Sequence, residues 1–320
     1  MSKRRFCNYL VILSLLFWTA CSSGKNAPDT NESFVVTDHV GRSVGFNKIP
    51  DKIISLSPGT TEIIFALGVN SKLVGVTSFC DYPAEAQSID QVGGYSTVDK
   101  EKVIDIIGGD VNDAVIFTST LHAMPGGVLS DFEQLGYKAV VLDANTLDRL
   151  FECMKLISRI SGGGETADAV IQSLEARVDA VKSRIGDDVP RVTVMHEVFG
   201  GHWIAGANTL ENDLITAAGG INIGALRGDG YGQINIESII NANPDKITVV
   251  SHMGAMVDGL VSSEITDNPV FRVLDAVRNH QIYVIEADIV SRSGPRAVDG
   301  LEAYAGILHP GIFGNPVFHR

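Results

Sequence analysis

The sequence predicts an α/β protein of two lobes joined by a mainly helical segment. Its 320 residues fit about two domains. Short apolar runs alternate with helical patterns in both halves, which favours parallel sheets covered by helices, and a long helical pattern separates the halves. The composition, 45% hydrophobic and 20% charged, excludes disorder or coiled coil as the overall architecture. Acidic groups outnumber basic ones 38 to 25 along the whole chain, so nucleic acid is not an expected partner.

Residues 1–20 are interpreted as a secretory signal that is not part of the fold. Lys3, Arg4 and Arg5 precede an apolar run of about 18 Å, well short of the roughly 30 Å of a bilayer core. The small residues before Cys21 resemble the bacterial lipobox, although Trp18 stands where Leu is usual. We therefore expect export and a lipid anchor on Cys21, with simple cleavage as the alternative.

Residues 21–33 are polar and predict a flexible tether between this anchor and the folded body. The N-terminal lobe is expected over residues 34–146, with strands at 53–56, 73–76, 114–117 and 139–142 and helices at 60–67, 100–107 and 128–135.

The connecting segment, residues 147–187, predicts two helices separated at Gly162-Gly163-Gly164. This glycine run lacks the strand and Lys-Ser/Thr context of a phosphate-binding loop, which favours a helix break. Apolar residues then recur at spacings of three and four: Ala167, Val170, Ile171, Leu174, Val178 and Val181. About 20 helical residues span roughly 30 Å. Because a helix of this length is stiff, we expect the two lobes to close only slightly on each other.

The C-terminal lobe is expected over residues 188–320. Its predicted strands are 192–195, 247–250 and 282–285, and its predicted helices are 210–218 and 296–308.

Each lobe repeats a unit that runs from a tyrosine to a glutamate six residues later. Tyr95 precedes Glu101 in the first lobe, and Tyr231 precedes Glu237 in the second. Each glutamate is predicted to open a helix, where the helix dipole favours a carboxylate. That stabilising role suffices for either residue alone, but the recurrence favours a paired surface role.

The cysteines indicate no zinc site. Cys7 leaves with the signal and Cys21 is the proposed lipid site, so only Cys80 and Cys153 remain. A disulfide between them is permitted outside the cytoplasm, but two separate buried thiols are the preferred interpretation.

Several separated segments resemble the periplasmic binding proteins of ABC importers for cobalamin, haem and ferric siderophores. The resemblance covers about residues 34–314. The segments are 53–68 (IISLSPGTTEIIFALG), 74–77 (VGVT), 80–86 (CDYPAEA), 92–95 (VGGY), 291–296 (SRSGPR) and 308–310 (LHP). The run at Cys80-Asp-Tyr-Pro is most similar to the cobalamin-binding branch. The resemblance implies a monomer with two Rossmann-like lobes joined by a long rigid helix, a ligand in the cleft between them and a permease dimer as partner.

The resemblance also implies which residues bind. Aromatic ligand contacts fall on Phe79, Tyr95 and Tyr231, and an acidic cleft residue falls on Asp288; aromatic faces suit a corrin ring, and core packing is the alternative for each ring. Ser57, in the segment Ser55-Leu-Ser-Pro58, is also expected to contact the ligand. At one further position the family has an aromatic residue, whereas this sequence has Thr118 and so departs from the family pattern. The docking glutamates that meet arginines on the permease correspond to Glu101 and Glu237.

Three histidines, His122, His196 and His252, follow predicted strands at their carboxyl ends, where open α/β sheets bind ligands. There an imidazole can ligate haem iron or corrinoid cobalt, or bond to a propionate or amide; an ordinary hydrogen-bonded histidine is the alternative. Together with Asp288, these histidines could also form the site of a protein that binds bare zinc or manganese ions, which is the less favoured alternative. No resident metal is assigned.

The motifs Gly-x-Ser-x-Gly and His-Glu-x-x-His are absent, which disfavours a secreted hydrolase and enzymes generally. We expect an extracytoplasmic solute-binding lipoprotein, without a catalytic cofactor, that captures a corrinoid such as cobalamin and delivers it to an ABC importer. A ferric siderophore or haem binder is the alternative.

Overall fold

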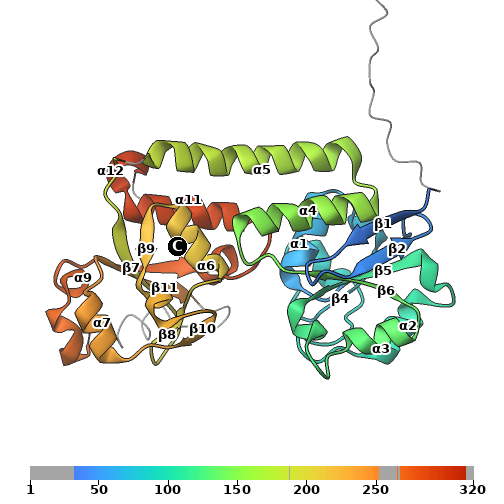
Figure 1. Ribbon diagram of the computed structural model, residues 1–320, viewed down its shortest axis with the longest axis horizontal. Coiled ribbons are helices and arrows are strands. Elements are labelled where there is room, and N and C mark those ends of the chain that lie inside the picture. The colour runs from blue at the N-terminus through green and yellow to red at the C-terminus, as the bar shows by residue number, and fades with distance from the viewer. Residues whose placement is uncertain (1–31, 187, 252–264, 266, 315–320) are drawn as a thin grey trace, which may run out of the picture.

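Two α/β lobes lie side by side beneath one long helix, α5 (Gly164–Ile185), in the computed structural model (Figure 1). The structure describes residues 32–186, 188–251, 265 and 267–314. The predicted fold class, with its long connecting helix, is confirmed. Among the described residues, no helix is both long and apolar enough to cross a membrane.

The N-terminal lobe is built on a four-stranded parallel sheet in the order β4-β3-β5-β6. Its strands are β3 (Lys52–Ser55), β4 (Leu73–Val76), β5 (Ala114–Ser119) and β6 (Lys138–Leu142). Along β5, Val115 and Phe117 pack toward α1 (Pro58–Ala66) and α4 (Leu147–Ser161). Ile116 packs on the other face, toward α2 (Lys100–Ile107) and α3 (Leu129–Gln134). Helices therefore cover both faces.

The first described strands form a separate antiparallel pair, β1 (Phe34–Thr37) with β2 (Ser43–Phe46), beside β6. Helix α1 carries Pro58 in its first turn, where the missing N–H is harmless, and Gly68 follows its end at φ 71°. These two residues mark the beginning and the end of α1.

The C-terminal lobe has a six-stranded sheet in the order β10-β8-β7-β11-β12, with β9 on β7. Its strands are β7 (Val192–Phe199), β8 (Trp203–Ala205), β9 (Gly220–Asn222), β10 (Tyr231–Gln233), β11 (Lys246–Ser251) and β12 (Ile282–Glu286). Its helices are α6 (Leu210–Ala217), α7 (Ile236–Ala242), α9 (Asp275–Arg278), α10 (Ala287–Val290), α11 (Ala297–Leu308) and α12 (Pro310–Phe313). Strands β9, β7, β11 and β12 are parallel, whereas β8 and β10 add an antiparallel edge.

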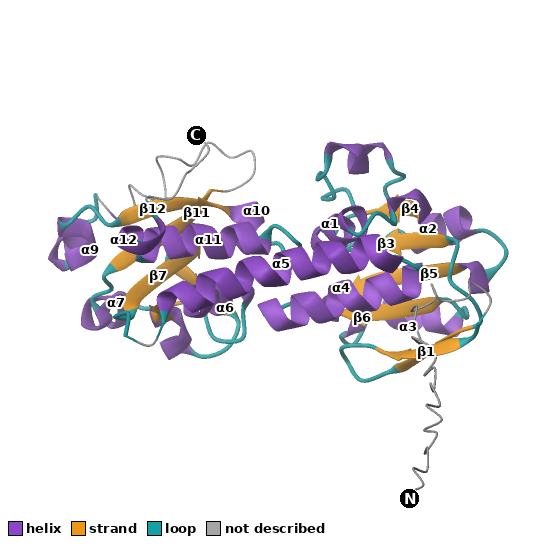
Figure 2. Cartoon of the chain, turned by 90° about the horizontal axis from the view of Figure 1, so that it is seen from above, coloured by secondary structure: helices purple, strands orange, loops and turns teal. Residues whose placement is uncertain are grey.

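The connecting helices join the two lobes through one continuous apolar core. Helix α4 ends at Gly162 in the left-handed conformation, φ 77°, as expected for a helix break. Helix α5 then packs on α4 over the first lobe and on α11 over the second (Figure 2). The cluster that contains Ile171 and Val178 of α5 extends from Ile53 in β3 to Ile285 in β12. The lobes therefore share a core.

The main differences from the sequence prediction are strand lengths and short strands. Strand β7 continues four residues beyond its predicted end, to Phe199, and β5 continues two, to Ser119. Strands β1, β2, β8, β9 and β10 have only three or four residues each and were not predicted. Strands β3 and β4 are as short but are mostly buried and apolar, whereas β1, β2 and β10 bury only one residue each.

We predict that proline at Ala176, an exposed residue in the middle of α5, distorts the whole molecule. Proline removes a helical hydrogen bond and costs about 3 kcal/mol, whereas glycine at the same position costs about 1 kcal/mol without a kink. Ala176→Pro should lower the free energy of unfolding and alter the small-angle scattering profile. Ala176→Gly should leave the profile unchanged. Identical profiles for wild type and the proline variant would show that α5 does not set the lobe arrangement.

Candidate ligand cleft between the lobes

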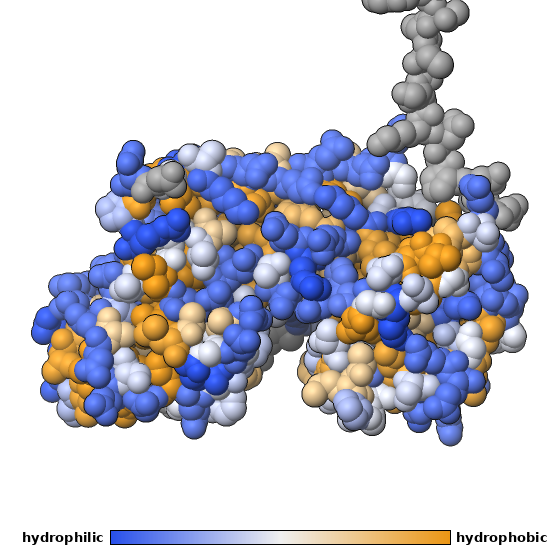
Figure 3. Space-filling model, in the orientation of Figure 1, coloured by the Kyte–Doolittle hydropathy of each residue, from blue (hydrophilic) through white to orange (hydrophobic). Residues whose placement is uncertain are grey.

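A hollow between the two lobes opens on the side away from α5 (Figure 3). In the first lobe, the chain leaves β3 toward β4 on one side and returns to β5 on the other. This topology leaves a crevice at the carboxyl ends of β3 and β5. A polar cavity of about 110 Å³ lies there. Its lining includes Ser57, Tyr95, Ser119 and, from the second lobe, Ser293.

Tyr95 is held in this crevice by the histidine that was expected to meet a ligand. The two ring nitrogens of His122 lie 2.8 Å from the Tyr95 carbonyl oxygen and 2.7 Å from the Thr118 hydroxyl. His122 is buried, and burial lowers its pKa, so the ring is neutral. Both nitrogens of His122 are therefore bonded within the protein, and its expected contact with a ligand, which would have to replace one of these bonds, stays a prediction. In this structure His122 supports the loop of Tyr95, which is 39% exposed.

Phe79, in the loop after β4, adds a second half-exposed ring to the first lobe. A side-chain carbon at Gly94, next to Tyr95, would come within 3.7 Å of the Phe79 ring. The two aromatic residues therefore belong to adjoining loops on one wall.

The second lobe presents three exposed aromatic residues on its antiparallel edge. Tyr231 lies opposite Ala205, and Trp203 lies opposite both Gln233 and Phe199. Residues directly opposite in antiparallel strands share a face of the sheet, so Phe199, Trp203 and Tyr231 share one face. The pKa of Tyr231 is raised, first by burial of its hydroxyl and then by Glu211 and, to a smaller extent, by Tyr95. Strand β10, which begins at Tyr231, lies on the side of the second lobe that faces the first (Figure 1), so this edge of the sheet borders the cleft.

Phe199 and Trp203 were missed by the sequence analysis. The cause is the early end predicted for β7, which put His196 instead of Phe199 at the carboxyl end of the strand. The exposed apolar residues that bracket Gly200-Gly201 were the signal available.

His196 lies in the interior of β7 and is fully buried, so its predicted place at the carboxyl end of a strand is wrong. Its Nδ1 is 2.9 Å from the hydroxyls of both Thr248 and Tyr304, which places the ring in the core. His252 lies outside the described residues. Among the residues that the structure describes, no group of three or more histidine, cysteine, aspartate or glutamate side chains is arranged to hold a metal ion.

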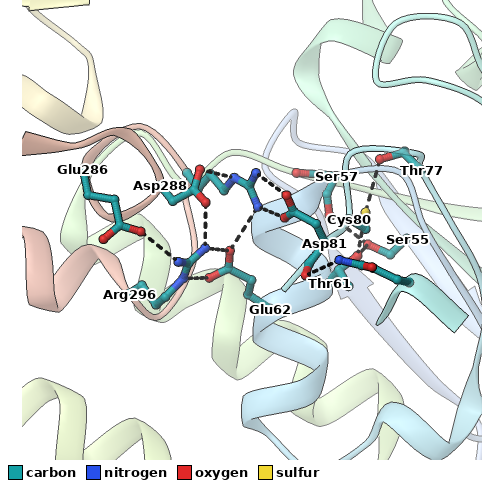
Figure 4. A network of polar contacts seen from close by, with 12 residues as sticks. Ser55, Ser57, Thr61, Glu62, Thr77, Cys80, Asp81, Glu286, Asp288 and Arg296 are labelled. Atoms are coloured by element: carbon teal, nitrogen blue, oxygen red, sulfur yellow. Dashed lines mark hydrogen bonds and ion pairs between the residues drawn. The ribbon is translucent and has the colours of Figure 1, made fainter. Parts of the chain in front are cut away.

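Asp288 takes part in an ion-pair network that crosses from one lobe to the other (Figure 4). Its carboxylate lies 2.8 Å from Arg292 Nε and 3.5 Å from Arg296 Nη2, all within the second lobe. Arg292 also reaches Asp81 in the first lobe, at 2.5 Å and 3.3 Å. Asp288 is thus engaged by two arginines, and its expected role as an acidic ligand contact has to compete with them.

The most buried member of this network is Glu62 of α1. Arg296 donates two hydrogen bonds to its carboxylate, at 2.6 Å and 2.9 Å, in the bidentate arrangement. The Glu62 side chain is only 1% exposed. Burial raises the pKa of Glu62, and the bonds and charges of Arg296 and Arg292 oppose that rise. The lobes therefore meet at a buried ion pair.

A larger cavity of about 470 Å³ lies at the same junction and includes residues of α5 in its lining. Tyr82 and Phe65 of the first lobe face Pro295 of the second there, and the Arg296 guanidinium lies 4.0 Å from the centre of the Tyr82 ring. Glu62 and Arg296 line this cavity, but Tyr95 lines only the smaller one.

The repeated glutamates occupy equivalent positions in their helices. Glu101 and Glu237 are both second residues, of α2 and α7, and both are exposed. The residues before these helices, Asp99 and Asn235, each accept a hydrogen bond from the backbone N–H three residues on. The remaining cysteines, Cys80 and Cys153, are separate buried thiols as preferred above.

A fold of two lobes, a rigid helical connector and an interlobe cleft is that of a solute-binding protein. Residues 53–289 match the family of periplasmic binding proteins, and the chain belongs to that family. It is therefore a solute-binding protein and not an enzyme. The resemblance stated from the sequence is confirmed.

Similar proteins narrow the comparison further. An uncharacterized ABC transporter substrate-binding lipoprotein of Bacillus subtilis, YvrC, is 26% identical over 98% of this chain and 99% of its own length. The vitamin B12-binding protein of Vibrio cholerae is 25% identical over 79% of this chain and 87% of its own. The crystal structure of the periplasmic vitamin B12 binding protein BtuF of Vibrio cholerae covers 81% of this chain and 96% of its own, with a TM-score of 0.67 at 23% identity. The haem-binding protein RhuT of Roseiflexus gives a TM-score of 0.66 at 22% identity, covering 81% of this chain and 99% of its own.

The buried His196 predicts a specific acid sensitivity. Burial lowers its pKa from 6.5 to about 3, so between these values the unfolded chain binds a proton that the folded protein does not. Stability is therefore lost as pH falls below 6.5, by about 3 kcal/mol between pH 7 and pH 4. Urea unfolding at the two pH values should show this loss in wild type and a smaller loss in His196→Gln. Equal losses in both proteins would mean that His196 is not neutral in the core.

Proposed function

We propose that the protein captures a corrinoid in the interlobe cleft and delivers it to an ABC importer. The observation that carries the proposal is the pair of exposed tyrosines, Tyr95 in the lining of the small cavity and Tyr231 on β10, at the edge of the second lobe that faces the first. Aromatic faces bury a large planar ring at a small cost in side-chain entropy. Phe79 and Phe199 extend the two walls.

The charges at the junction of the lobes favour a corrinoid over haem. The interlobe network contains four carboxylates, Glu62, Asp81, Glu286 and Asp288, but only two arginines. This excess of negative charge opposes the propionates of haem and accommodates the uncharged amides of a corrinoid. The vitamin B12-binding relatives support the same choice. Haem and ferric siderophores remain the alternative cargo.

The remaining parts of the proposal concern location and partner. A solute-binding protein of an ABC importer works outside the cytoplasm. The apolar leader and Cys21 support a lipid anchor there, as does the description of the Bacillus relative as a lipoprotein. We infer that the protein acts as a monomer and presents Glu101 and Glu237 to arginines on a two-fold permease.

Replacing a cleft tyrosine should weaken corrinoid binding. We expect Tyr95→Ala or Tyr231→Ala to cost about 1 to 3 kcal/mol of binding free energy, because a central aromatic contact is lost. Isothermal titration with cyanocobalamin measures the effect. Tyr82→Ala is the matched control, since this half-exposed ring lines the larger cavity and stacks on Arg296. Unchanged affinity in both cleft variants, with the fold intact, would refute this site.

Reversing the two exposed glutamates should block delivery without blocking capture. Exposed ion pairs contribute only about 0 to 1 kcal/mol each, so their proposed role is orientation on the permease. In Glu101→Arg with Glu237→Arg, cyanocobalamin binding should persist, while uptake through the reconstituted importer falls strongly.

Glu165→Arg is the matched control for this pair. Glu165 is also the exposed second residue of its helix, but it lies on α5, away from the open side of the cleft. Its uptake should equal that of wild type. Normal uptake in the double variant would reduce Glu101 and Glu237 to helix-stabilising residues.

A further inference from the structure

A buried glutamate lies directly behind the cleft residue Tyr231. Glu211 is the second residue of α6 and has no exposed surface. The Tyr231 hydroxyl donates a hydrogen bond to Glu211 Oε2 at 2.9 Å. The ring of Tyr231 stays half-exposed in the cleft. Its hydroxyl is therefore fixed in the lobe while its face remains available.

This carboxyl is costly to bury. Burial raises the pKa of Glu211, and hydrogen bonds from its own backbone N–H, Tyr231 and Ser291 oppose the rise only in part. Its other oxygen, Oε1, has no hydrogen-bond partner among the described residues. An apolar side chain in this place would avoid both costs. The residue therefore needs a reason other than stability.

Glu211 also connects Tyr231 to the junction of the lobes. Ser291, whose side chain lowers the pKa of the same carboxyl, directly precedes Arg292. Arg292 pairs with Asp81, two residues from Phe79 on the opposite wall. Polar contacts and short stretches of backbone thus link the tyrosine on one wall to the loop that carries the phenylalanine on the other.

We propose that Glu211 is a positioning residue that fixes the Tyr231 ring at the angle at which it meets the ligand. The Tyr231 side chain turns about two torsions, and one hydrogen bond at its tip restrains both. The ring is then ordered before the ligand arrives, and binding does not have to order it. This inference rests on the proposed function, because it takes Tyr231 to be a ligand contact.

The test is a double-mutant cycle on the affinity for cyanocobalamin. Glu211→Leu should weaken binding by about tenfold, the effect of losing one hydrogen bond and the order that it imposes. Glu211→Gln keeps an acceptor for the tyrosine hydroxyl and should recover most of that loss. In a Tyr231→Phe background, where no hydroxyl exists to be held, Glu211→Leu should cause no further loss.

A purely structural role gives a different result. Wild-type affinity in Glu211→Leu, or the same tenfold loss in the Tyr231→Phe background, would overturn the proposal. Leu removes a buried carboxyl at similar volume, so the variant is expected to fold. If Glu211→Leu does not fold, Tyr231→Phe alone decides. Its affinity for cyanocobalamin should then fall by about tenfold, and an unchanged affinity would overturn the proposal.

The inference can also be separated from the choice of ligand. If wild type binds neither cyanocobalamin, haemin nor ferrichrome, the proposed function fails, whereas urea unfolding of the free proteins still tests the contact. A measurable coupling between Glu211→Leu and Tyr231→Phe then supports the restraint of the Tyr231 ring by Glu211 but not a role in binding the ligand. Additive effects would overturn it.

Discussion

The arrangement of this molecule depends on the buried ion pair between Glu62 of the first lobe and Arg296 of the second. The Glu62 side chain is 1% exposed and that of Arg296 is 16% exposed, and each is compensated chiefly by the other. Removing one partner of such a pair costs about 3 to 5 kcal/mol, because the remaining charge stays buried. Since its partners come from different lobes, this penalty opposes any motion that separates them.

The apolar core reinforces the same constraint. The cluster beneath α5 is continuous from β3 to β12, so a change in the angle between the lobes would break packing contacts as well as ion pairs. A cleft held in this way meets its ligand with walls already in place. Less free energy is then spent on ordering the site, and large closure is not needed to form it. The exposed aromatic residues Tyr95, Tyr231 and Phe199 are consistent with such a preformed site.

The sequence predicted the longer elements well because their periodicity is local. The apolar spacing of α5 and the buried runs at β3 and β11 needed no tertiary information. The predictions failed where the length of a strand, or the distant side chains that a residue contacts, decides its position in the fold. Strand β7 extends past a histidine and a glutamate that only a folded interior makes acceptable, so Phe199 was missed and His196 was misassigned.

The ion-pair network shows the same limit. The motif containing Arg292 and Arg296 was recognised from the sequence, but its partners Glu62 and Asp81 lie more than 200 residues away. No local pattern pairs them. Asp288 was accordingly expected to be an acidic ligand contact, although two arginines engage it.

The central claim is that the ion pair and the shared core hold the lobes at one separation. The most direct measurement is the distance distribution between spin labels at Gln134→Cys in α3 and Asn241→Cys in α7, exposed positions on opposite lobes. The native Cys80 and Cys153 are buried and should not take the label. One narrow distribution, the same with and without cyanocobalamin and broadened by Arg296→Met, is the predicted result. A distribution that is broad in wild type, shifts on loading or is unaffected by Arg296→Met would contradict the claim.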